Sequence, residues 1–424
     1  AAINTNGGVL TINSAGAAAL SGGVTGVGSS LVKQGAGELS LSGSNTYSGG
    51  TTIRVGTLRT AAASALPEGG AVSLEGSAVL NLDDKTQGIG NLSGASGTRI
   101  ALGAAGTGGL AVNQTSDDTF AGQITGSGPA SGTAALSKTG AGVLTLSGAN
   151  SFTGLTQVSE GALRVTASNA LAAASSLEVT GTGTFEIDGV AFNSLASLTL
   201  TGDQAGLETL AGRGAASYAG TVTLLGLGRV AAAGASDALT LSGHIDGHSD
   251  AGANPALTKA GAGTVTLSGI NNGYAGGTTI AAGTLVVQQA DALGSGTVTV
   301  NDGATLEIDN VMLATAGLTL NGSGVGGAGA LQGTGTASHE GSVTLATASA
   351  IGAATTSDTL TLKNQVSGTG PLTKVGDGIV ALSDSNTYTG GTTVEAGTLV
   401  ARNANAFGND AVRVNNGATL LIDG

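Results

Sequence analysis

Histidine, a side chain suited to both metal binding and proton transfer, occurs three times in the 424 residues. His244 and His248 lie in the segment HIDGHSDAGANP with Asp246 between them. Imidazole and carboxylate groups at this spacing could bind a metal ion. No helical pattern places them on one face and no second ligand cluster accompanies them. An exposed polar loop is therefore the favoured interpretation, and we expect neither a metal nor a cofactor.

Carboxylates recur at the ends of four similar apolar segments, which read LNLD, FEID, LEID and LLID. Paired carboxylates can act as general acid and base on a glycosidic bond. These four recur only once per hundred or so residues, some five turns and roughly 25 Å apart in a stack of strands. They are interpreted as turn residues at strand ends: Asp83, Asp188, Asp309 and Asp423. The sequence also lacks cysteine and a supported G-x-S-x-G nucleophile motif, so we expect no enzyme activity.

Lysines and aromatic rings each occupy one recurring position. The lysines could contact an anionic ligand, but local pairing with a carboxylate or a carbonyl at a corner is favoured. The rings could form a surface stripe that stacks on sugars, but packing of each ring over its own turn is favoured. Asparagines at a third position are interpreted as turn or stacking residues. The lysines are Lys33, Lys138, Lys259 and Lys374, and the rings are Tyr47, Phe152, Tyr274 and Tyr388.

All these positions belong to four copies of one internal repeat, at 31–84, 136–189, 257–310 and 372–424. Within each copy, short runs such as ELSLS and TTIRV alternate apolar and polar residues, which predicts strands with one buried face. Glycine, asparagine, serine and aspartate between the runs supply turns. Equivalent apolar residues, such as Leu39, Leu58 and Leu80, recur roughly every 20 residues, a period typical of a solenoid. We predict an all-β, right-handed parallel β-helix of about 20 turns, forming one domain and a single elongated rod over 1–424.

Composition narrows the protein class further. Glycine contributes 77 residues, aromatic residues 2% and charged residues 10%. Glycine has no period of three, which excludes collagen, and the 40% hydrophobic content is too high for disorder. A net charge of −13 opposes binding to nucleic acid, which is not an expected partner. The chain starts at Ala1, without an initiator methionine or a leader, so we expect a mature or excised fragment.

The pattern K-x-G-x-G-x-L-x-L-S-G-x-N-x-Y-x-G-G-T-x-x-x-x-G-T-L resembles the passenger-associated, or autotransporter-associated, β-strand repeat of Gram-negative type V autotransporters. The match is clearest at 33–58, 259–285 and 374–399. The second copy departs from it, because Phe152 replaces the tyrosine, Leu155 the second glycine and Ala162 the threonine. The resemblance implies a β-helical passenger that is exported through its own C-terminal β-barrel translocator, which would lie outside this chain.

The expected function is that of a non-catalytic adhesin at the bacterial cell surface or released from it. Its partners would be host surface or matrix proteins or glycans, or identical passengers on neighbouring cells during aggregation and biofilm formation. Two alternatives stay open: capture of a soluble host protein for immune evasion, and a stem for a catalytic domain outside this fragment. Protruding loops at 122–134 and 243–256 are the first expected binding sites, with Gln123, Ser127, His244, Asp246 and His248 as candidate residues.

Overall fold

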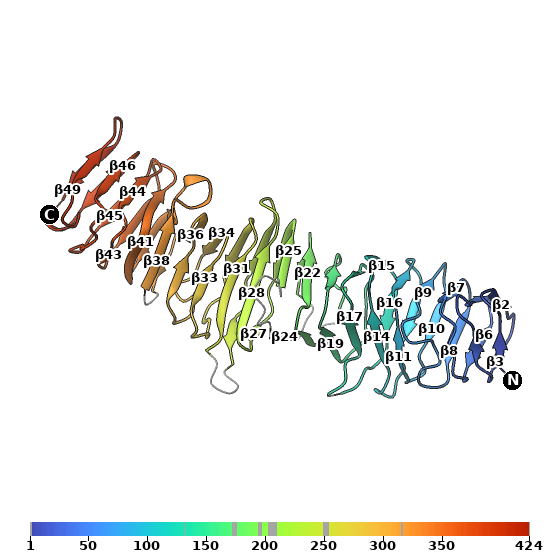
Figure 1. Cartoon of the computed structure of the whole chain (residues 1–424). Helices are drawn as coiled ribbons and strands as arrows, with labels where there is room; N and C mark the ends of the chain where they lie inside the picture. The colour runs from blue at the N-terminus through green and yellow to red at the C-terminus, as the bar shows by residue number, and fades with distance from the viewer. Residues whose placement is uncertain are drawn as a thin grey trace. The chain divides into compact units, whose positions relative to one another are not determined.

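The computed structural model divides into two compact units, residues 1–209 and 210–424, and each is described by itself. The described residues are 2–130, 132–171, 176–193, 197–201, 210–248, 254–314 and 317–423. Five residues of the expected loop at 243–256, Ser249 to Ala253, lie outside them. Over these ranges both units consist of short strands and turns, with one short 3-10 helix at Val325–Gly327 in unit 2. Figure 1 shows the strands of each unit lying side by side in stacks.

Alternation of apolar and polar residues determines which side chains enter the core. In the segment ELSL, Leu39 and Leu41 are buried whereas Glu38 and Ser40 are partly exposed. Each strand pairs in parallel with a strand one turn later, so equivalent leucines stack. Leu39 pairs with Leu58, and Leu58 pairs with Leu80. The predicted parallel β-solenoid, with its repeat of roughly 20 residues, is confirmed within each unit.

Unit 1 contains three long ladders of parallel strands. The first ladder contains β3 (Ala18–Leu20), β6 (Glu38–Leu41), β8 (Thr57–Thr60), β10 (Val79–Asn81), β13 (Arg99–Ala101) and β16 (Gln123–Thr125). The second contains β2 (Val9–Asn13), β5 (Ser30–Gln34), β7 (Thr51–Ile53), β9 (Val72–Leu74), β12 (Leu92–Gly94), β15 (Asp118–Phe120), β18 (Val143–Leu146), β20 (Ala162–Val165) and β22 (Thr184–Asp188). The third contains β11 (Thr86–Ile89), β14 (Gly109–Asn113), β17 (Leu136–Thr139), β19 (Leu155–Val158), β21 (Ser176–Val179) and β24 (Ser197–Leu200). Shorter strands are β1 (Ile3–Asn4), β4 (Val24–Thr25) and β23 (Ala191–Phe192).

Unit 2 repeats this arrangement. One ladder contains β25 (Leu210–Arg213), β28 (Leu227–Ala232), β31 (Ala256–Ala260), β33 (Thr278–Ile280), β35 (Val298–Val300), β38 (Gly317–Gly322), β41 (Ser342–Ala353), β43 (Val366–Gly368), β44 (Leu372–Val375), β46 (Thr392–Val394) and β48 (Val412–Val414). A second contains β26 (Ala215–Tyr218), β29 (Ala238–Leu241), β32 (Thr264–Leu267), β34 (Gly283–Val287), β36 (Ala304–Asp309) and β39 (Leu331–Thr334). A third contains β37 (Met312–Leu313), β40 (Thr336–His339), β42 (Thr359–Leu362), β45 (Ile379–Leu382), β47 (Thr398–Ala401) and β49 (Thr419–Ile422). A shorter pair is β27 (Val222–Leu224) with β30 (Ile245–Gly247). The long strand β41 joins the first two of these ladders, because its first half pairs with β38 and β43 and its second half pairs with β39 and β44.

Close stacking of corners explains why the chain contains so much glycine. A Cβ atom on Gly37 would collide with the carbonyl of Gly16 on the preceding turn. Gly56 has a φ of +75°, a conformation that residues with a Cβ atom rarely adopt, and a Cβ there would meet the carbonyls of the preceding corner. Glycine therefore occupies corners where successive turns approach each other most closely.

Candidate functional site

The repeat lysines lie inside the solenoid, in columns of aliphatic side chains. Lys33 on β5 pairs with Ile12 on one side and Ile53 on the other, and it has no exposed surface. Lys138, Lys259 and Lys374 are equally buried. Their alkyl chains fill the core as an isoleucine would, while the ammonium group reaches the corner. A surface array of cationic ligand contacts is therefore wrong for these four residues.

Each ammonium group donates three hydrogen bonds to backbone carbonyls, which uses all its donors. Lys33 Nζ donates to the carbonyls of Gln34 at 3.0 Å, Gly35 at 2.7 Å and Val55 at 3.0 Å. Val55 lies 22 residues further along the chain, on the next turn. Lys138 and Lys374 donate to carbonyls at the same three relative positions, and Lys259 donates to the carbonyls of Gly261, Gly263 and Ala282. We call this arrangement the lysine clamp, because it joins two successive corners.

Burial lowers the pKa of the clamp lysines. The pKa of Lys138, Lys259 and Lys374 falls to about 8, and that of Lys33 is lowered as well. The three donated hydrogen bonds require the protonated, ammonium form of each lysine. The clamp is a structural device, and none of the four lysines is accessible to a ligand.

An asparagine in each copy joins three successive turns. Asn45 Oδ1 accepts a hydrogen bond from the Val24 amide at 2.7 Å, and its Nδ2 donates to the Ala65 carbonyl at 2.5 Å. These partners lie 21 residues before it and 20 residues after it. We call this arrangement the asparagine bridge, and it recurs at Asn150, Asn272 and Asn386. The recurring asparagine signals it in the sequence, but its three-turn span was missed.

The repeat rings pack inside the coil, so a sugar-stacking surface stripe is wrong. Tyr47, Phe152, Tyr274 and Tyr388 are at most 1% exposed. The Tyr47 hydroxyl bonds to Thr51 Oγ1 at 2.6 Å, and the Tyr274 and Tyr388 hydroxyls bond to equivalent threonines. Burial raises the pKa of Tyr47 to about 12. In the second copy Phe152 has no hydroxyl, and the buried Thr156 hydroxyl has no hydrogen-bond partner in the described part of the chain.

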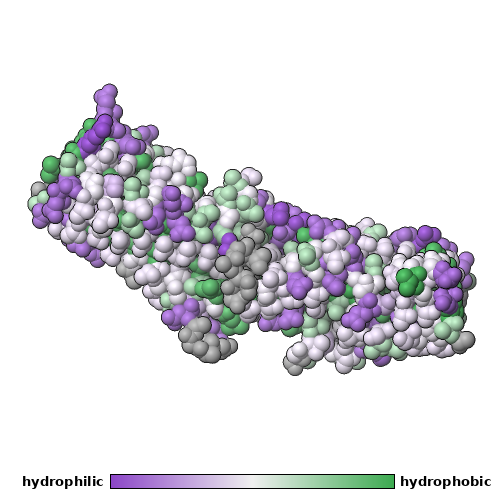
Figure 2. All heavy atoms as spheres, viewed as in Figure 1, coloured by the Kyte–Doolittle hydropathy of each residue, from purple (hydrophilic) through white to green (hydrophobic). Residues whose placement is uncertain are grey.

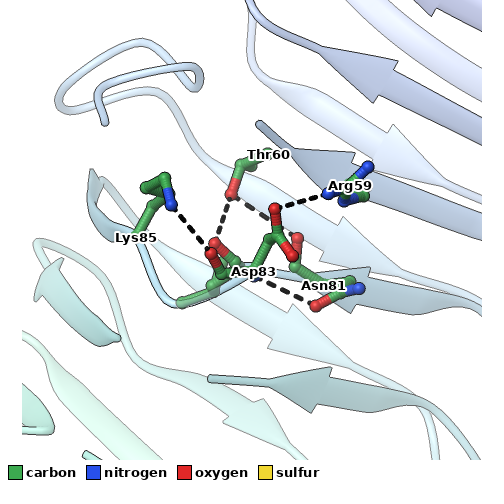
Figure 3. A network of polar contacts seen from close by, with 6 residues as sticks. Arg59, Thr60, Asn81, Asp83 and Lys85 are labelled. Carbon is green, nitrogen blue, oxygen red and sulfur yellow. Dashed lines mark hydrogen bonds and ion pairs between the residues drawn. The ribbon is translucent and has the colours of Figure 1, made fainter. Parts of the chain in front are cut away.

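The strand-ending aspartates lie on separate turns. Asp83 has a φ of +49° and forms an ion pair of 2.7 Å with Arg59 on the preceding turn. Figure 3 shows it in a local network with Asn81 and Lys85. Asp309 accepts from Gln288 at 2.8 Å and from Thr334 at 3.1 Å. The other two complete the set: Asp188 is the last residue of β22, and Asp423 is exposed beyond β49.

The expected binding loops are partly strand. Gln123 lies in β16 opposite Arg99, and Asp246 lies in β30 opposite Thr223, so the loop predictions are wrong at these two positions. The reason is that Ile124 and Ile245 enter the core and draw their neighbours into parallel pairing. Beside these strands lie Ser127, in an isolated bridge to Thr153, and His248, whose amide bonds to the Leu224 carbonyl.

His244 is a surface residue directly before β30. Its Nδ1 lies 3.2 Å from the Ile270 carbonyl, and its Nε2 lies 3.7 Å from Asp246 Oδ1. Across the described ranges, no group of three histidine, aspartate or glutamate side chains is arranged to hold a metal ion. Nor does any helix in those ranges have the length and apolar character needed to cross a membrane.

A surface hollow of about 420 Å³ lies beside the first asparagine bridge. Asn45, Tyr47, Leu66 and Glu68 are among its lining residues. Glu68 is its one carboxylate, so this hollow contains no pair of acids for hydrolysis.

Pale residues of intermediate hydropathy cover much of the visible surface in Figure 2.

Comparison with known proteins identifies a repeat within each of the four predicted copies. A family model described as passenger-associated-transport-repeat matches residues 31–59, 136–165, 257–287 and 372–401. The chain is 34% identical over 408 residues to the adhesin BmaC autotransporter of Brucella suis biovar 1 (strain 1330). That alignment covers 92% of this chain but only 10% of the relative. No solved structure matches the chain significantly.

Proposed function

The chain is a piece of an autotransporter passenger that carries four passenger-associated transport repeats, and from this premise we propose that it is a non-catalytic adhesive segment. It acts at the bacterial cell surface or after release from it. Its own C-terminal β-barrel translocator, outside this chain, exports it. The observation that carries the proposal is the similarity to an adhesin over 92% of the chain.

The physical character of the surface supports adhesion. The repeat lysines, asparagines and rings all serve the interior, and the outer faces carry many half-exposed serine, threonine and asparagine side chains beside charged and some apolar residues. Such faces form many weak hydrogen bonds, whose sum becomes strong when many copies act together. The partners that fit are host surface or matrix proteins or glycans, and identical passengers on neighbouring cells.

Beads coated with the folded chain test the proposal. We expect these beads to attach to matrix-protein or glycan coatings, or to aggregate with one another. Control beads that carry the same chain in an unfolded state, prevented from refolding, should do so less. Equal behaviour of the two bead types in every assay would contradict the adhesive role. Capture of a soluble protein from serum without attachment or aggregation would favour immune evasion instead. Cleavage of the coating by the chain would contradict the non-catalytic role.

A further inference from the structure

Met312 carries the one sulfur atom of the sequence, on the surface of unit 2. The chain contains one methionine and no cysteine. Met312 lies on β37 and is 49% exposed, whereas its neighbour Leu313 is fully buried. Thiols and thioethers are the side chains that peroxides oxidise, and exposure favours the reaction. Composition and exposure therefore direct such oxidation to one residue.

The aromatic side chains do not compete for an oxidant. Tryptophan is absent from the sequence. All four tyrosines are at most 1% exposed, and they are Tyr47, Tyr218, Tyr274 and Tyr388. Met312 is therefore the most accessible target for a mild oxidant.

An ammonium group lies against the sulfur of Met312. Lys363 Nζ donates to Met312 Sδ at 3.5 Å, and the same group forms an ion pair of 2.6 Å with Glu340 Oε1. A thioether is a weak acceptor, so the contact with sulfur contributes little by itself. An ammonium group has three rotatable donors, and it can serve the carboxylate and a further acceptor together.

These three side chains come from three successive turns of the solenoid. Met312 belongs to β37, Glu340 directly follows β40, and Lys363 directly follows β42. The strand β37 pairs in parallel with β40, and β40 pairs with β42. A bond between Met312 and Lys363 therefore reaches across the intervening turn.

The strand β37 is the least secured member of its ladder. It has two residues, and within the described part of the chain it is the first strand of the ladder. The Ser338 amide donates to the Val311 carbonyl at 3.1 Å, and the Glu340 amide donates to the Leu313 carbonyl at 3.0 Å. An additional bond from the side chain of Met312 would measurably strengthen so short a strand.

We propose that Met312 is an oxidation site for hydrogen peroxide and that Lys363 is positioned to bind the sulfoxide oxygen formed there. A lone pair of Sδ attacks one peroxide oxygen, so that a sulfur–oxygen bond forms while the oxygen–oxygen bond breaks. The sulfur loses two electrons, and the peroxide is reduced. The proton of the transferred oxygen passes to the departing hydroxide, which leaves as water.

The product is a better hydrogen-bond acceptor than the thioether, because oxidation converts an apolar side chain into a polar one. The new oxygen is bonded directly to Sδ, so a small rotation brings an N–H of Lys363 to it. The ion pair with Glu340 uses another donor of the same ammonium group and stays intact. Oxidation should therefore fasten β37 to the turn after β42. This inference is independent of the adhesive function.

Hydrogen peroxide added to the folded full chain tests the proposal, with free methionine in the same solution as the reaction standard. Peptide mass spectrometry should find one added oxygen atom per chain, on Met312, and none in Met312→Leu. Hydrogen exchange of the amide at position 340, which donates to the Leu313 carbonyl, reports how firmly β37 is held. We expect oxidation to slow this exchange by at least about threefold, as a partly exposed hydrogen bond would.

Two variants isolate the contribution of the ammonium group. Lys363→Leu removes the donor, so oxidation should no longer slow exchange of the amide at position 340. That change also breaks the ion pair with Glu340. Glu340→Gln is the matched control, because it removes the ion pair but keeps the ammonium group, and oxidation should still slow exchange in it. Circular dichroism should show the same strand content in every variant.

An unmodified Met312 after the free methionine has been oxidised would overturn the oxidation site, and so would added oxygen chiefly at other residues. Equal slowing of exchange in the unaltered chain and Lys363→Leu would overturn the assignment of Lys363. Faster exchange in the oxidised unaltered chain would overturn it as well.

Discussion

Lys259 Nζ donates a hydrogen bond of 2.7 Å to the carbonyl of Ala282, which lies 23 residues further along the chain. This bond and two others to Gly261 and Gly263 hold two corners of unit 2 together around one buried ammonium group. A cation in an aliphatic column is tolerated because every donor has a partner. The charged lysine of the repeat therefore stabilises the fold.

Lys259→Met should destabilise the chain. Methionine fills the column with a similar alkyl chain but leaves three carbonyls without their donor, at a cost of about 3 kcal/mol in the free energy of unfolding. Urea unfolding followed by circular dichroism measures this cost. Lys363→Met is the matched control, because Lys363 is exposed and forms a surface ion pair with Glu340, and it should cost less than about 1 kcal/mol. Equal costs for the two variants would contradict the lysine clamp.

Asn386→Ala should loosen three turns at once. The side chain accepts from the Val366 amide at 2.7 Å and donates to the Ala406 carbonyl at 2.6 Å, so its removal leaves two buried backbone groups unpaired. Hydrogen exchange of the Val366 amide should accelerate by at least about tenfold. Asn409→Ala, at an exposed position, should leave that amide unaffected. Slow exchange in both variants would show that the bridge is dispensable.

Phe152→Tyr should stabilise the second repeat copy. The new hydroxyl would bond to Thr156 as Tyr47 bonds to Thr51, which adds about 1 kcal/mol to the free energy of unfolding. A double-mutant cycle with Thr156→Val isolates the pair. The valine change should be nearly neutral or stabilising beside Phe152, but destabilising beside the introduced tyrosine. Additive effects in the cycle would refute this pairing.

His339→Leu should make unit 2 less sensitive to acid. His339 is fully buried on β40, in a column with Leu313 and Leu362, and neither ring nitrogen has a hydrogen-bond partner of good geometry in the described part of the chain. Burial lowers the pKa of His339 from the ordinary 6.5. The backbone of Ser342 and of Leu313 and the Glu340 carboxylate act to raise this pKa, but their effect is smaller. As the pH falls, this histidine is therefore protonated in the unfolded chain before it is protonated in the folded chain. The free energy of unfolding decreases as the pH falls below 6.5.

The comparison is made between about pH 7.5 and about pH 5, where the unaltered chain should lose about 1–2 kcal/mol more than His339→Leu. Urea midpoints at the two pH values measure the difference. His244→Leu, at a partly exposed position, serves as the control and should retain the full acid sensitivity. An identical pH dependence of the unaltered chain and His339→Leu would disprove the assignment.

Most of the strands, their parallel stacking and many of the corners could be predicted from the sequence alone. These follow from local physics: alternation at Leu39 and Leu41 marks a buried face, and glycine at positions such as Gly56 permits a left-handed corner. Because the same pattern returns about every 20 residues, stacking was the one arrangement that buried every apolar face.

Which polar side chains lie in the interior depends on contacts between turns and could not be predicted from the sequence. A lysine reads as a surface residue in its own sequence context, and the carbonyl that completes its clamp belongs to a residue 22 or 23 positions later. The reach of Asn45 to both neighbouring turns is equally non-local. Gln123 looked like part of a loop because its strand has three residues, too few for periodicity to show, and pairing with Arg99 on the preceding turn defines it. Contacts between turns, which no short segment encodes alone, assigned these side chains to the interior or to a strand.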